Sequence, residues 1–149
     1  MRIWIDGDAC PRAVRTIVFR AAERVEVEAV LVANQDIQVP RSRFARAVRV
    51  GAGFDVADHH ILQSAEPGDV VITQDIPLAA ELVPKGVHAI STRGEEFTED
   101  NVADRLAVRD LLQGLRDVGQ TTGGPPPFGE ADKRTLASAL DRLLTAALR

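Results

Sequence analysis

Three aspartates stand at places where the strands of a sheet would end. Asp6 follows the apolar run 3–5, Asp75 comes shortly after the apolar run 70–72, and Asp58 lies near the start of a helical pattern just before that second run. Open parallel sheets bind ligands beyond the carboxyl ends of their strands. Carboxylates that converge there repel one another, and a hard divalent cation with oxygen ligands relieves that repulsion. The pattern predicts a Mg²⁺ or Mn²⁺ site for phosphoryl transfer, with Asp6, Asp58 and Asp75 as catalytic ligands.

The surroundings of Asp58 favour this interpretation. Asp58, Ile61, Leu62 and Ala65 have the spacing of one helix face, and that face is apolar. A carboxylate on a core-facing stripe is costly unless it is paired or bound to a metal. Taken alone, Asp58 would fit a solvent-facing aspartate favoured by the helix dipole. Together with Asp6 and Asp75, it favours the metal site.

Other polar residues near these strand ends have two possible roles. Asp8 is a further candidate metal ligand or the N-cap of a helix beginning at Pro11, and Asp75 could likewise cap a helix beginning at Ile76. Asp55 is expected to support the metal. The hydroxyl of Thr73 is expected to donate a hydrogen bond to a neighbouring carboxylate or to a substrate phosphate.

Sulfur and imidazole groups are expected to play little part in the chemistry. A helix N-terminus near Cys10 would favour a thiolate, but the nearby aspartates oppose it, so a small buried packing residue is favoured. His59 and His60 are adjacent, and neighbouring positions on a helix point about 100° apart. They cannot both face one metal from a regular helix, and zinc would need more ligands of this kind.

Basic residues gather in the segment 41–49, which contains no acidic residue. They are Arg41, Arg43, Arg46 and Arg49, with Phe44 among them. The strip could follow a nucleic-acid backbone, with Phe44 offering a stacking surface. A solvated helix edge with Phe44 in the core explains the pattern equally well.

A second possible anion site lies in the Gly/Pro-rich loop 120–129. Gly123 and Gly124 could form a nest of backbone N–H groups. A plain linker is equally compatible, although the loop is long for a connection without structure. We expect the partner to be RNA or another phosphate-bearing ligand.

Composition sets the broad class. The chain has 149 residues, 45% of them hydrophobic and 27% charged, which predicts one domain over 1–149 with a helical extension over 98–149. The net charge of -4 is compatible with an acidic metal site beside a local basic surface. The single cysteine, the direct start into a strand and the absence of a long apolar run lead us to expect a cytoplasmic location and no membrane partner.

Strand and helix patterns alternate along the chain. Strands are predicted at 2–6, 27–33, 69–73 and 87–91, and the segment 41–49 is predicted to contain a short helix that runs into a strand ending at Val50. Helices are predicted at 11–24, 55–65, 76–83, 98–118 and 131–148. This order predicts an α/β fold: a three-layer sandwich with a mainly parallel sheet of about five strands, plus two C-terminal helices.

Short sequence motifs from end to end resemble the YaiI/YqxD family of uncharacterised bacterial proteins. They include Asp6-Gly7-Asp8-Ala9-Cys10-Pro11, Gly53-Phe54-Asp55-Val56-Ala57-Asp58, Gly68-Asp69-Val70-Val71-Ile72-Thr73-Gln74-Asp75-Ile76-Pro77-Leu78-Ala79, Arg93-Gly94-Glu95, Leu106-Ala107-Val108-Arg109-Asp110 and Thr122-Gly123-Gly124-Pro125.

A broader likeness concerns the acidic positions. Asp6 after the first strand, Asp58 followed by Ile61, and Val71-Ile72-Thr73 followed by Asp75 are similar to PIN-like nuclease domains. That resemblance implies a PIN-like fold and a Mg²⁺- or Mn²⁺-dependent site that hydrolyses RNA phosphodiesters. The mid-chain helical Glu usual in PIN domains has no equivalent here, and Asp8 and Asp55 are the expected replacements.

Two other functions stay open at this point. The first is a binding module that holds RNA or a nucleotide in the acidic crevice without cleaving it. The second is a phosphatase similar to haloacid dehalogenases, in which Asp6 would be the nucleophile and Asp8 the acid/base, with Thr73 and Lys85 in support.

Overall fold

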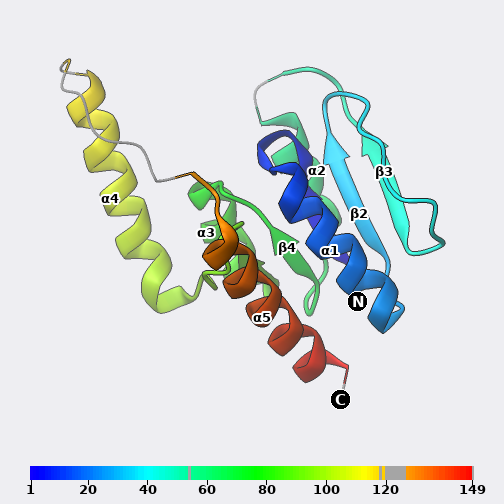
Figure 1. Ribbon diagram of the computed structural model, residues 1–149. Coiled ribbons are helices and arrows are strands. Elements are labelled where there is room, and N and C mark those ends of the chain that lie inside the picture. The colour runs from blue at the N-terminus through cyan, green and yellow to red at the C-terminus, as the bar shows by residue number, and fades with distance from the viewer. Residues whose placement is uncertain (54, 118, 120–126, 149) are drawn as a thin grey trace.

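A five-stranded parallel sheet forms the centre of the molecule (Figure 1). The computed structural model describes residues 1–53, 55–117, 119 and 127–148. The strand order is β3-β2-β1-β4-β5, and every neighbouring pair is parallel. The strands are β1 (Ile3–Asp6), β2 (Ala29–Ala33), β3 (Ala45–Arg49), β4 (Val70–Ile72) and β5 (His88–Ile90).

Helices cover both faces of this sheet. On one face lie α1 (Arg12–Val25) and α5 (Glu130–Ala147), which pack against each other. On the other lie α2 (Val56–Ser64) and α3 (Ile76–Leu82), and α4 (Glu99–Asp117) packs against α3 and extends away from the sheet (Figure 1). Short 3₁₀ turns, η1 (Gly7–Ala9) and η2 (Val83–Lys85), follow β1 and α3. The predicted three-layer α/β fold with two C-terminal helices is confirmed.

Alternation along the strands divides the core in two. Ile3 and Ile5 of β1 contact the cluster under α1 and α5, whereas Trp4 contacts the cluster under α2 and α3. Successive side chains of a strand point to opposite faces, so residues 3–5 of β1 must all be apolar because both faces are covered. This is why the inner strands appear in the sequence as continuous apolar runs.

A buried carboxylate joins the beginnings of β1 and β4. Asp69 is only 5% exposed and accepts three hydrogen bonds: from the backbone N–H of Arg2 (3.0 Å), from Nε1 of Trp4 (3.0 Å) and from the backbone N–H of Glu66 (2.9 Å). Both carboxylate oxygens therefore have partners, which offsets the cost of burying the charge. Asp69 lies at the amino-terminal edge of the sheet, opposite the predicted site.

The last helix is tied to the loop after β5. Arg93 forms an ion pair of 2.8 Å with Asp132, and Gly94 lies against the backbone of Thr135 and Leu136. A Cβ at Gly94 would come within 2.7 Å of these atoms, and the residue has a φ of +87°, so glycine is required twice over. This contact holds the start of α5 against the loop that follows β5.

Differences from the sequence-based prediction are local. The expected short helix in 41–49 is wrong: residues 41–44 form bends and a turn, in which the Ser42 hydroxyl accepts a hydrogen bond from the N–H of Phe44, and β3 begins at Ala45. The loop glycines Gly123 and Gly124 lie outside the described residues. In the part of the chain that the structure describes, no helix has the length and apolar character needed to cross a membrane.

Candidate functional site

Five aspartates line one pocket at the carboxyl edge of the sheet. Asp6 is the last residue of β1, Asp8 lies in η1, Asp55 and Asp58 lie at the start of α2, and Asp75 directly precedes α3. The pocket has a volume of about 370 Å³, and all five side chains line it. The structure therefore brings together every acidic residue that the sequence predicted for the metal site.

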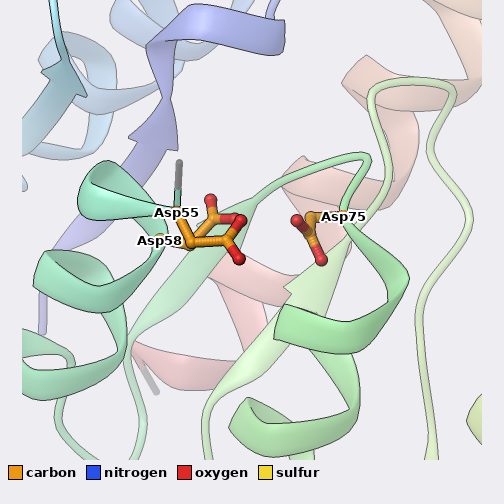
Figure 2. A group of neighbouring side chains, drawn as sticks. All are labelled: Asp55, Asp58 and Asp75. Carbon is orange, nitrogen blue, oxygen red and sulfur yellow. The ribbon is translucent and has the colours of Figure 1, made fainter. Parts of the chain in front are cut away.

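Three of these carboxylates are close enough to share one ion. Oxygen atoms of Asp55, Asp58 and Asp75 lie within 4.8 Å of one another. Asp58 belongs to α2, and Asp55 is the residue before this helix. Figure 2 shows both side chains facing that of Asp75. Oxygen ligands at about 2.0–2.6 Å from a common centre would have this spacing.

Asp6 is the most buried member of the group. It is 5% exposed, and its Oδ2 accepts a hydrogen bond of 3.1 Å from the Thr73 hydroxyl. Burial raises the pKa of Asp6 above its ordinary 3.8; the charges of Asp75 and Asp8 act in the same direction, whereas the hydrogen bonds from Thr73 and Asp58 lower it. Thr73 thus supports the charged form of Asp6, as predicted for a neighbouring carboxylate, while its contact with a substrate stays a prediction.

Asp58 occupies the centre of the cluster. Its pKa is raised from 3.8 to about 8, first by burial and then by its hydrogen bond with Asp75 and by the charges of Asp6, Asp75 and Asp55. A protonated Asp58 can donate a hydrogen bond to a neighbouring carboxylate. Without a cation, the cluster therefore lowers its own charge by keeping a proton at neutral pH.

Local backbone structure orients the outer members. The Oδ1 atom of Asp75 accepts a hydrogen bond of 2.9 Å from the N–H of Leu78, which makes Asp75 the N-cap of α3. The backbone N–H of Asp75 in turn donates to the Thr73 hydroxyl (3.0 Å). Asp55 is the N-cap residue of α2 in left-handed conformation (φ 61°), but its side chain makes no capping hydrogen bond. One Asp75 oxygen and the whole Asp55 carboxylate are thus not used for capping.

Asp8 has a different role from the predicted cap. Pro11 is the N-cap residue of α1, so the prediction that Asp8 caps this helix is wrong. Both carboxylate oxygens of Asp8 instead accept hydrogen bonds from the backbone N–H of Asn34, at 3.1 and 3.0 Å. This contact joins η1 to the end of β2. Gly7 makes the turn possible, because a Cβ there would lie 2.6 Å from the side chain of Leu31.

Cys10 and the histidines do not belong to the group of three carboxylates with the spacing of a metal site, although His59 lines a second pocket together with Asp58 and Asp75. Cys10 is buried, and desolvation raises its pKa from 9.0 to about 12, against the smaller opposing effect of Arg15. His60 contacts Trp4 edge to face, with ring centroids 6.4 Å apart, whereas His59 is exposed. Among the residues that the structure describes, only Asp55, Asp58 and Asp75 meet the spacing of a metal site, and this all-oxygen donor set is suited to Mg²⁺ or Mn²⁺ rather than zinc.

Two residues near the site were not predicted. A second pocket of about 320 Å³ adjoins the first and shares Asp55, Asp58 and Asp75, and Arg109 of α4 and Glu81 of α3 line it as well. Arg109 brings a guanidinium to the border of the acidic group and contacts Asp110 at 3.2 Å. The sequence feature that could have indicated Arg109 is the motif 106–110. The family resemblance included this motif but gave Arg109 no role.

The arginines of the segment 41–49 do not form one continuous surface. In β3, Arg46 and Arg49 are three residues apart, so their side chains point to opposite faces of the sheet. Arg46 lies 3.8 Å from Glu28, and Arg49 pairs with Asp36 at 3.1 Å. Arg43 stacks over the Phe44 ring at 5.2 Å, and Arg41 is exposed. Their contact with RNA stays a prediction.

The phosphatase alternative is not supported by the position of Lys85. This residue ends η2, shortly before β5 begins, whereas Asp6 is the last residue of the parallel strand β1. The two therefore lie at opposite edges of the sheet, and the Lys85 ammonium donates to the backbone oxygen of Leu62 (2.7 Å). The expectation that Lys85 assists Asp6 is wrong.

Comparison with known proteins identifies the family. A family model described as "Uncharacterized BCR, YaiI/YqxD family" matches residues 4–146. The chain belongs to the YaiI/YqxD family. It is 57% identical over 145 residues to a UPF0178 protein of Myxococcus xanthus, covering 97% of this chain and 95% of the relative. A UPF0178 protein of Hahella chejuensis is 51% identical over 144 residues, covering 97% of this chain and 96% of the relative.

Both relatives of this YaiI/YqxD chain match it over almost their whole length, so the acidic pocket lies within the shared region. The family resemblance expected from the motifs is confirmed. No solved structure matches the chain.

Proposed function

We propose that this YaiI/YqxD protein is a Mg²⁺- or Mn²⁺-dependent nuclease that hydrolyses RNA phosphodiesters. The observation that carries the proposal is the convergence of Asp6, Asp55, Asp58 and Asp75 on one pocket at the carboxyl ends of parallel strands. Ligands bind at this edge of parallel sheets. Because burial and mutual repulsion raise the pKa of Asp58 to about 8, the cluster is costly in its charged form and would be relieved by a cation.

The donor set fits such a cation. Asp55, Asp58 and Asp75 would hold it directly, because their oxygens lie within 4.8 Å of one another. Asp6, fixed by Thr73, would complete or support the set. When bound, a divalent ion supplies a water of lowered pKa and neutralises charge on the phosphate.

The residues of the chain would divide the remaining work. The hydrogen bonds to Thr73 and Leu78 hold Asp6 and Asp75 in fixed orientations before substrate arrives, which reduces the cost of assembling the site. Arg109, which lines the adjoining pocket, would contact the non-bridging oxygens of the scissile phosphate. The RNA, a polyanion, would then contact the positively charged side chain of Arg109 in addition to the metal ion.

Cleavage of labelled single-stranded RNA tests the proposal. We expect cleavage with Mn²⁺ or Mg²⁺ and none with chelator. Asp75→Asn should reduce the rate at least about 100-fold while RNA affinity changes little, because the lost interaction acts on the transition state. Asparagine keeps an oxygen for the Leu78 N–H, so α3 should stay capped. Asp104→Asn on the exposed surface of α4 is the matched control.

A substitution at Arg109 separates binding from chemistry. Arg109→Gln should lower the cleavage rate about 10- to 100-fold with an unchanged Mn²⁺ affinity. Protein that binds RNA and Mn²⁺ but cleaves neither RNA nor DNA across a broad panel would instead be a binding module. Protein that binds neither would contradict both functions.

A further inference from the structure

A groove larger than the acidic pocket lies outside that site. It is a groove of about 660 Å³ between α1 and the segment 37–45 that leads from β2 to β3. Its α1 wall is formed by positions 12, 15, 16, 19, 20 and 23, which follow one another at helical spacing on a single face. Arg12, Arg15 and Arg20 lie on this face, with Glu23 at its far end.

Ion pairs among the described residues do not neutralise the arginines of the groove. Within the described residues, the guanidinium groups of Arg12, Arg15 and Arg20 form no ion pair, whereas Arg24 and Arg49 pair with Asp141 and Asp36. Glu23 is the only acidic residue among the groove residues. A concave surface with three unpaired arginines is suited to an anion, since guanidinium groups form bidentate contacts with phosphate.

The groove begins near the acidic pocket. Asp6 ends β1, η1 follows directly, and α1 starts at Arg12, so the first turn of α1 lies at the same edge of the sheet as the aspartates. Arg15 and Asp6 both act on the pKa of the intervening Cys10, in opposite directions. From there the groove follows α1 from Arg12 to Glu23, roughly 16 Å along the helix axis.

Apolar side chains also line the groove, beside the polar residues Gln38 and Ser42. Phe19 is 6% exposed, and Ile37 and Val39 are partly buried against the same core. A ring this buried offers no free surface on which a base could stack. The groove would therefore contact backbone and sugar and would tolerate many sequences. Three cations along one axis favour a ligand with several anionic groups in a row over a single small anion.

We propose that this groove binds the phosphodiester backbone of single-stranded RNA and leads it to the acidic pocket. The proposal rests on the nuclease function proposed above and names where its substrate is held. It assigns the main backbone contacts to α1 rather than to Arg46 and Arg49 of β3, both of which are already paired with acids.

Binding of a short fluorescent oligouridylate in chelator tests the groove without cleavage. Arg12→Gln/Arg20→Gln changes two exposed groove arginines, and Arg134→Gln/Arg142→Gln changes two exposed arginines of α5 that form no ion pair within the described residues. Both variants lose the same charge. We expect the groove variant to bind at least about 10-fold more weakly and its log–log salt slope to fall by about 1.4, or 0.7 for each lost contact. The α5 variant should retain the wild-type slope, and melting curves should show that both variants fold.

Several results would overturn the groove assignment. They are equal losses in the two variants, no binding of the oligonucleotide by the wild-type protein, and displacement of the RNA by an oligoglutamate peptide as efficiently as by unlabelled RNA of equal charge. Unchanged binding by the groove variant together with Mn²⁺-dependent cleavage would remove the groove and leave the nuclease. Groove-dependent binding without any cleavage would remove the nuclease and leave the groove.

Discussion

The hydroxyl of Thr73 lies 3.1 Å from Oδ2 of Asp6, and both side chains are almost completely buried. The same hydroxyl accepts the backbone N–H of Asp75 at 3.0 Å. One side chain at the end of β4 thereby sets the position of two carboxylates that belong to different elements.

Replacing Thr73 should therefore damage both stability and metal binding. Thr73→Val removes the donor that lowers the pKa of Asp6 and leaves the Asp75 N–H without its acceptor. We expect a loss of about 1–3 kcal/mol in the free energy of unfolding, measured by urea denaturation, and weaker Mn²⁺ binding. Thr73→Ser keeps the hydroxyl and should behave much more like wild type. Equal behaviour of the valine and serine variants would show that the hydrogen bond has no such role.

Stability should depend on pH through Asp58. Its pKa is about 8 in the folded protein against 3.8 for the ordinary carboxyl. Between these values the unfolded chain releases a proton that the folded chain keeps, so the free energy of unfolding falls as pH rises from about 4 to about 8. The asparagine of Asp58→Asn does not titrate, so the free energy of unfolding of this variant should rise relative to that of the wild type as pH increases over this window. Since Asp58 is only partly buried, screening reduces the gain to about 1–2 kcal/mol.

Urea denaturation in chelator at several pH values measures this effect, with Asp104→Asn as the surface control. A difference between Asp58→Asn and wild type that stays constant with pH would contradict the raised pKa.

Metal binding should release a proton. At pH 6 to 7 most Asp58 side chains are protonated, and a metal ligand must be deprotonated. Mn²⁺ binding should therefore release up to one proton per site, less at higher pH, and its affinity should rise with pH until about 8. Calorimetry in two buffers with different ionisation enthalpies counts the protons. Release that persists in Asp58→Asn would assign the proton to another group, with Asp6 the first candidate.

The thiol of Cys10 should be inert in the folded protein. Its pKa of about 12, against 9.0, lowers the thiolate fraction at pH 8 by roughly 1,000-fold. Iodoacetamide should modify folded protein very slowly and urea-unfolded protein readily, and Cys10→Ser should retain RNA cleavage. Fast alkylation of the folded chain would reopen a catalytic role for this residue.

The convergence of the aspartates could be predicted from the sequence better than the structure around them. Asp6 and Asp75 follow apolar runs that form neighbouring parallel strands, and such strands bring their carboxyl ends to one edge. Asp58 was found because it interrupts an apolar helix face, and its neighbours Ile61 and Ala65 are fully buried.

The failures arose where tertiary contacts decide the structure. Strand β3 lies at the edge of the sheet and is largely exposed, so it lacks the apolar run that marked the inner strands, and its arginines resembled a helix edge. Arg109 reaches the site only because α4 packs against α3, which no local pattern indicates. Arg12, Arg15 and Arg20 line a groove only because the segment 37–45 folds against α1, and the sequence of α1 alone does not indicate this contact.

Asp69, at the amino-terminal edge of the sheet, helps to determine the geometry of the acidic pocket at the opposite edge. By accepting from the backbone of Arg2 and the indole of Trp4, it fixes which residue of β1 stands beside which residue of β4. A slip of one position would turn every side chain of β1 to the opposite face, and Asp6 would then leave Thr73. The positions of the carboxylates therefore depend on Asp69, although it lies at the opposite edge of the sheet from them. A substitution at Asp69 that shifted the register between β1 and β4 would misplace Asp6 relative to Thr73 and Asp75.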